Sequence, residues 1–164
     1  VIFEKHLESN ILQALEETHP YEEIAYDIVS LENVHDRIGM GIIGELSNFM
    51  TENDFLSLLK QRFNLQCIRH SKLLNKPIKK IAVLGGAGSF AIDKAKHSGA
   101  DIYISSDFKY HEFFKAESQF VLADIGHYES EQFTKNLLVD YLTKKFRNFA
   151  IVLSEKNTNP INYL

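Results

Sequence analysis

The sequence predicts an α/β fold with a mostly parallel sheet flanked by helices, preceded by part of a small α+β (ferredoxin-like) domain. Two observations support the sheet. Short runs rich in Ile, Val and Leu recur in the second half of the chain, and amphipathic helical patterns separate them. Strands that are apolar on both faces and alternate with helices are typical of parallel sheets. The runs lie at 81–84, 101–104, 120–123 and 149–153.

Length and composition limit the function classes. The chain has 164 residues, 45% apolar and 24% charged, which fits one globular domain with or without a small appendage. A net charge of -4 and a pI near 6.0 give no strong nucleic-acid signal. No apolar run approaches the roughly 18 residues of a membrane span. The single Cys67 excludes an intramolecular disulfide, so a reducing, cytoplasmic setting is expected.

The first region begins with a predicted strand at 1–3. A helix follows, because apolar residues from Leu7 to Leu15 recur on one face, and it ends at His19-Pro20 since the residue before a proline avoids the α region. Partial alternation predicts a strand at 24–31.

A second extended segment, 40–46, contains Gly41 and Gly44. A helix is predicted over 53–63, and Thr51 with Asp54 forms a weak capping signal before it. A short strand is expected at 66–70, with Cys67 buried.

Three further helices are expected in the second region, at 90–98, 110–117 and 130–146. The last carries an apolar stripe that should be buried against the sheet. The stripe consists of Phe133, Leu137, Leu138, Tyr141 and Leu142.

The chemistry should lie at the carboxyl ends of the parallel strands, where α/β sheets bind ligands. Unusual sequences follow three of the runs: a glycine loop at 85–89, a polar loop at 105–111 and an acidic, histidine-containing loop at 124–131. Neighbouring parallel strands would bring these loops to one edge of the sheet.

His127 and Glu131 are the candidate metal ligands. They are four residues apart at the start of a predicted helix, so both can reach one point above the strand end. Imidazole and carboxylate suit zinc, iron or manganese, but a catalytic zinc usually has three protein ligands. His111 is the candidate third ligand or catalytic proton donor. Helix capping by Glu131 and solvated positions for both histidines are the alternatives.

The glycine loop allows a different interpretation. Residues 86–91 fit G-x-G-x-x-A, and Asp107 follows about 20 residues later, as in a nicotinamide-dinucleotide site. A tight turn between strand and helix is the simpler alternative, and an oxidoreductase would leave the His127/Glu131 pair unexplained.

Four motifs in order resemble the GTP cyclohydrolase 1 type 2 homologues, a family also named for an NGG-interacting factor. They are HPYEEIAYD at 19–27, GGAGS at 85–89, the loop at 107–111 and GHYESE at 126–131. The resemblance implies that residues 1–35 end a PII/CutA-like insertion and that 36–164 form the C-terminal lobe of the metal-binding domain.

The family resemblance implies a centre of two divalent metals (zinc, iron or manganese) in each intact subunit. His127 and Glu131 match two of its ligands, and the N-terminal ligands, a His-His pair and an Asp, have no counterpart in this chain. The resemblance also implies homo-oligomers, hexamers when the protein is intact.

The function expected from the resemblance is metal-dependent, hydrolase-like chemistry on a nucleotide or related heterocycle, with His111 or Lys109 nearby. The alternative is a non-enzymatic metal-binding scaffold or regulatory interaction protein.

Overall fold

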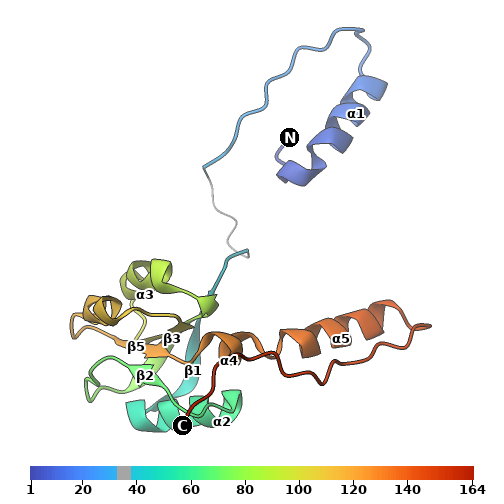
Figure 1. Ribbon diagram of the computed structural model, residues 1–164. Coiled ribbons are helices and arrows are strands. Elements are labelled where there is room, and N and C mark those ends of the chain that lie inside the picture. The colour runs from blue at the N-terminus through green and yellow to red at the C-terminus, as the bar shows by residue number, and fades with distance from the viewer. Residues whose placement is uncertain (33–37) are drawn as a thin grey trace. The chain divides into compact units, whose positions relative to one another are not determined.

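A computed structural model describes residues 1–32 and 38–164 of the chain. The chain divides into two compact units, Val1–Asp36 and Arg37–Leu164, which we describe separately (Figure 1). The predicted boundary between residues 35 and 36 lies outside the described residues. The assignment of residues 1–35 to an inserted domain stays a prediction.

The first unit contains a 3-10 helix, η1 (Lys5–Leu7), and one α-helix, α1 (Glu8–Thr18). The helix ends at His19, which is extended as expected before Pro20. The predicted strands at 1–3 and 24–31 are wrong, since both segments lack regular structure. A strand is stable only beside another strand, and no partner for them occurs in the described part of this unit.

The second unit is built on a five-stranded sheet with the order β1-β3-β4-β5-β2. The strands are β1 (Ile42–Met50), β2 (Arg69–His70), β3 (Ile78–Ala87), β4 (Ile102–Ser106) and β5 (Val121–Asp124). The three central strands, β3, β4 and β5, are parallel, and the edge strands β1 and β2 pair antiparallel to them. This arrangement confirms the predicted α/β fold.

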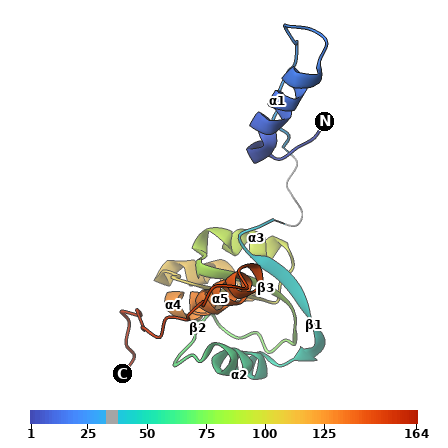
Figure 2. The same ribbon diagram turned by 90° about the vertical axis from the view of Figure 1, so that its right-hand side faces the viewer.

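Helices cover both faces of the sheet. The helix α2 (Glu52–Phe63) packs on one face, and the other carries η2 (Ser89–Ala91), α3 (Ile92–His97) and η3 (Tyr110–Ala116), as Figure 2 shows. Side chains of β4 alternate between the two layers: Ile102 packs with the α2 cluster and Tyr103 with the α3 cluster. Burial on both faces explains why apolar residues follow one another without alternation in the middle of these strands.

The start and end of α2 follow from local sequence. The Thr51 hydroxyl accepts a hydrogen bond from the Asp54 backbone N–H at 3.1 Å, which confirms the predicted cap. Asn64 ends the helix in a left-handed conformation, φ 53°. The following strand is shorter than predicted, and Cys67 is exposed rather than buried.

The C-terminal part departs most from prediction. The single helix expected at 130–146 is two helices, α4 (His127–Glu131) and α5 (Thr134–Lys145). The Gln132 side chain between them donates a hydrogen bond to the Phe63 carbonyl at 2.8 Å, which ties this junction to the end of α2. No helix in the described part of the chain is long and apolar enough to cross a membrane.

The last predicted strand, 149–153, has no regular structure and pairs with no strand in the described part of the unit. It runs back along α5, where the Lys135 ammonium donates to the Ser154 carbonyl at 3.0 Å (Figure 1). The apolar stripe predicted to be buried is largely exposed, with Leu137 70% and Tyr141 58% accessible.

Candidate metal centre

The carboxyl ends of β3, β4 and β5 meet at one edge of the sheet, as the sequence predicts. The Gly86 backbone N–H, at the end of β3, donates to the Ser130 hydroxyl in α4 at 2.8 Å. Asp107 follows β4 directly and contacts His127, which follows β5. The three loops therefore form one continuous surface.

His127 lies between two carboxylates. Its Nδ1 is 2.6 Å from Asp107 Oδ2, and its Nε2 is 3.4 Å from Glu131 Oε2. The His127 side chain is 47% exposed, so the cluster opens to solvent. A carboxylate only accepts hydrogen bonds, so Asp107 holds the proton on Nδ1 and leaves the Nε2 lone pair of a neutral ring facing Glu131.

This arrangement favours a positive charge between Nε2 and Glu131. Two lone-pair donors that face each other repel unless a proton or a cation lies between them. In the absence of a cation the proton is favoured: the hydrogen bond to Asp107 raises the pKa of His127, and the charges of Asp107 and Glu131 raise it further. A divalent cation at the same point would replace that proton.

Asp107 adopts an unusual backbone conformation, with φ 60°. Aspartate tolerates this left-handed region better than most residues. The next residue, Phe108, is 2% exposed, and its N–H donates to the buried Asp124 carboxylate at 3.0 Å. Asp124 also pairs with Arg69. These contacts hold the loop so that Asp107 reaches His127.

The glycine loop packs against the same cluster. Gly86 has φ 70°, and a side chain there would collide with the Glu131 carboxylate. A side chain at Gly88 would collide with Ser105 and Tyr103. The Ser105 hydroxyl donates to the Gly86 carbonyl at 3.0 Å. Close packing thus accounts for both glycines, and Asp107 contacts His127, so the geometry adds no support to a dinucleotide site.

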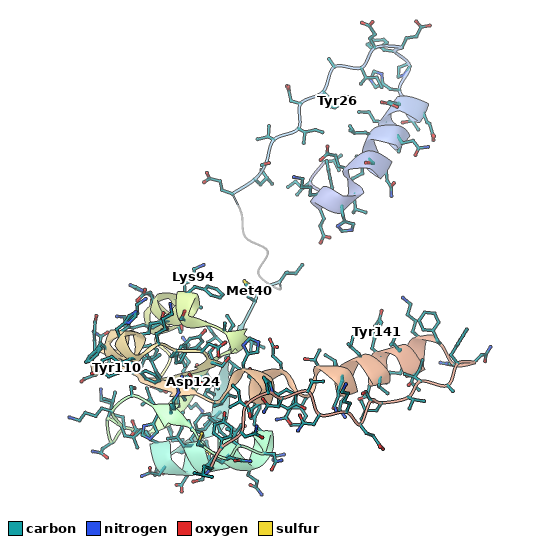
Figure 3. All side chains as sticks on the ribbon, in the orientation of Figure 1. Tyr26, Met40, Lys94, Tyr110, Asp124 and Tyr141 are labelled. Carbon is teal, nitrogen blue, oxygen red and sulfur yellow. The ribbon has the colours of Figure 1, made fainter. Side chains whose placement is uncertain are left out.

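The structure does not bring His111 to this cluster. His111 lies in η3 and is exposed. Within the described residues, no hydrogen bond or ion pair joins it to His127 or Glu131. In Figure 3 its neighbour Tyr110 lies at the margin of the unit, whereas Asp124 lies inside the unit. His111 as a catalytic acid stays a prediction.

A metal ion fits this donor set only in part. His127 and Glu131 offer one imidazole nitrogen and one carboxylate. Asp107 contacts the other ring nitrogen, Nδ1, and so orients the imidazole, as carboxylates beside metal-binding histidines commonly do. No group of three or more His, Cys, Asp or Glu side chains in residues 1–32 and 38–164 is arranged to hold an ion. A complete centre would need ligands from elsewhere.

The role of Asp107 is the feature that sequence reasoning missed. The sequence places Asp107 at the same edge of the sheet as His127. The signal that could have indicated its role is an acidic residue immediately after a buried parallel strand. Its contact with His127 depends on the left-handed turn, which sequence does not indicate.

The fold and the cluster define an α/β protein with a histidine–carboxylate site at its sheet edge. Residues 2–160 match the family model described as Duf34/NIF3 (NGG1p interacting factor 3), and the chain belongs to this family. Proteins named GTP cyclohydrolase 1 type 2 homolog from Staphylococcus epidermidis and Bacillus subtilis are each 36% identical, over 92% and 99% of this chain. The chain spans only 42% and 45% of their lengths.

Solved structures show the same fold. Staphylococcus aureus protein SA1388 is similar with a TM-score of 0.79 at 28% identity, over 100% of this chain and 54% of that one. A Bacillus cereus protein related to NIF3 is similar with a TM-score of 0.75 at 32% identity, over 99% of this chain and 46% of that one.

Proposed function

We propose that His127 and Glu131 supply two ligands of a divalent metal centre in a protein of which this chain is part. The observation that supports the proposal is the orientation of the His127 imidazole, which contacts Asp107 through Nδ1 so that its Nε2 faces Glu131 across 3.4 Å. The remaining ligands would come from outside the described residues. The donor set suits zinc, iron or manganese. The proposal includes two such ions in each intact subunit.

We further propose hydrolase-like chemistry on a nucleotide or related heterocycle. The name GTP cyclohydrolase 1 type 2 homolog, carried by the relatives, supports this class. A bound divalent ion would act there as a Lewis acid. This chain would hold the ion, orient the imidazole through Asp107, and leave the half-exposed cluster open to substrate. The lone exposed Cys67 agrees with a cytoplasmic location.

A second candidate is a non-enzymatic scaffold that keeps the metal for structure or regulation. The exposed apolar face of α5 supports this candidate, because uncovered apolar patches are typical of protein interaction surfaces. The proposed partner is a second copy of the same protein, in a hexamer when the protein is intact. Self-association is compatible with either function.

Metal content tests the proposed centre. The natural protein that carries this chain is expected to retain zinc or manganese after gel filtration, measured by plasma mass spectrometry, and His127→Ala with Glu131→Ala should lower the content at least tenfold. The matched control removes the exposed pair His6 and Glu4, whose Nδ1 and Oε2 atoms lie 3.3 Å apart. Equal metal loss in both double variants, or none in either, contradicts the proposal.

Turnover separates the two candidates. A hydrolase should release product from one member of a nucleotide panel and lose that activity in the His127→Ala, Glu131→Ala variant. A scaffold should bind metal, stay oligomeric and hydrolyse none of the panel.

A further inference from the structure

The side of α4 opposite the candidate site is held by the C-terminal tail. Residues 127 and 131 share one side of the helix, and residue 129, half a turn away, faces the other. Glu129 is 8% exposed, whereas the His127 and Glu131 side chains are about half exposed. A buried carboxylate on a five-residue helix at the surface needs a partner to compensate its lost hydration.

Asn159 is that partner. Its side-chain amide donates to Glu129 Oε1 at 3.0 Å, across 30 residues of sequence. The amide is fixed by its own surroundings: Asn159 Oδ1 accepts from the Ile161 backbone N–H at 3.1 Å, and the Asn159 N–H donates to Asn157 Oδ1 at 2.9 Å. Two successive Asx turns around Pro160 therefore present the Asn159 amide to α4.

Tyr163 approaches the second oxygen of the same carboxylate. Within the described residues Glu129 Oε2 is buried without a hydrogen-bond partner. Both this oxygen and the Tyr163 hydroxyl lie beside Gly126, the residue that precedes α4; the hydroxyl is 3.3 Å from the position a Gly126 side chain would occupy. Burial raises the pKa of Tyr163, and the charge of Glu129 adds to that shift, so the hydroxyl keeps its proton.

We propose that the tail residues Asn159 and Tyr163 form a latch on Glu129 that positions α4, and through it His127 and Glu131. Asn159 and Tyr163 are positioning residues, since neither touches the candidate ligands. The latch would hold the helix in the orientation that lets His127 face Asp107 on one side and Glu131 on the other. The positioning role rests on the proposed metal centre, but the latch itself can be observed without metal.

The test compares three variants of the chain by amide hydrogen exchange and NMR. Asn159→Ala removes the donor, and Asn159→Asp removes it and sets a negative charge against Glu129. The matched control is Asn162→Ala, an exposed asparagine of the same tail. The amides of Ser130 and Gln132, which bond to the Gly126 and Tyr128 carbonyls, report on α4. The His127 ring resonance reports on the site.

Exchange at Ser130 and Gln132 is expected to accelerate about tenfold in Asn159→Ala and more in Asn159→Asp, and the His127 resonance should shift in both. The amides of β4 should keep their protection, which separates loss of the latch from unfolding. If both Asn159 variants behave like Asn162→Ala, the latch is wrong. Zinc uptake is measured separately, on the natural protein that carries this chain. A natural protein that binds none contradicts the metal centre alone, because the exchange and NMR results need no metal.

Discussion

The centre of the sheet and one stripe of the helix α5 are both apolar in sequence but have opposite surroundings. Ile102 of β4 and Leu122 of β5 are completely buried, whereas Leu137 of α5 is 70% exposed. The central strands have helices on both faces, and the apolar face of α5 has no cover in the described part of the chain. An apolar pattern therefore shows which face can be buried, and the neighbouring elements decide whether it is.

The largest effect should follow from a cavity at the sheet centre. Leu122→Ala removes a fully buried side chain that packs with Tyr103, Phe108 and Phe120. We expect the free energy of unfolding to fall by about 2–5 kcal/mol. Urea denaturation followed by circular dichroism measures the change. The matched variant Leu137→Ala in α5 should lose far less, and equal losses would show that the two regions do not differ in packing.

A smaller loss should follow from overpacking the glycine loop. A side chain at Gly88 meets Ser105 and Tyr103, both buried in the sheet. Gly88→Ala is therefore expected to cost about 1–3 kcal/mol in the free energy of unfolding. Gly44→Ala is the control, because a side chain at Gly44 has open space around it. A Gly88 variant as stable as the Gly44 variant would contradict the close packing of the glycine loop against β4.

The same contrast explains how much of the fold can be predicted from the sequence. The runs at 81–84, 101–104 and 120–123 correspond to strands because burial on both faces leaves an unambiguous apolar pattern. The run at 149–153 has a similar composition but no strand beside it in the described residues, so its prediction failed. Local patterns record hydrophobicity, and pairing depends on the rest of the molecule.

Part of the candidate site can also be predicted from local sequence, and part of it cannot. Helical spacing predicts that His127 and Glu131 lie together, and His127 Nε2 is 3.4 Å from Glu131 Oε2. The contact of His127 with Asp107 requires a left-handed residue after β4, and the latch on Glu129 requires a tail 30 residues away. Neither follows from local spacing.

The exposed face of α5 should matter for assembly and little for folding. We expect the double variant Leu137→Ser, Tyr141→Ser to change the free energy of unfolding by no more than about 0.5 kcal/mol per site, as is usual for exposed positions. Analytical ultracentrifugation should show a smaller assembly than the wild-type protein. If the variant unfolds at a lower urea concentration but keeps the sedimentation coefficient of the wild-type protein, α5 is covered by its own chain.

The smallest effect should come from Glu112, a surface carboxylate whose pKa is lowered chiefly by one backbone hydrogen bond. The Lys109 backbone N–H donates to Glu112 Oε2 at 2.7 Å, which lowers the pKa of Glu112 below its ordinary 4.5. The stabilisation is complete above the unfolded-state pKa and is lost as the pH falls through the lower, folded-state pKa. Glu112→Gln should therefore be slightly less stable than wild type at pH 7, and the difference should shrink below about pH 4.5. Urea midpoints from pH 7 to pH 3 measure it. If the stability difference between Glu112→Gln and wild type grew on acidification, its pH dependence would have the opposite sign, and the hydrogen bond from Lys109 could not be its cause.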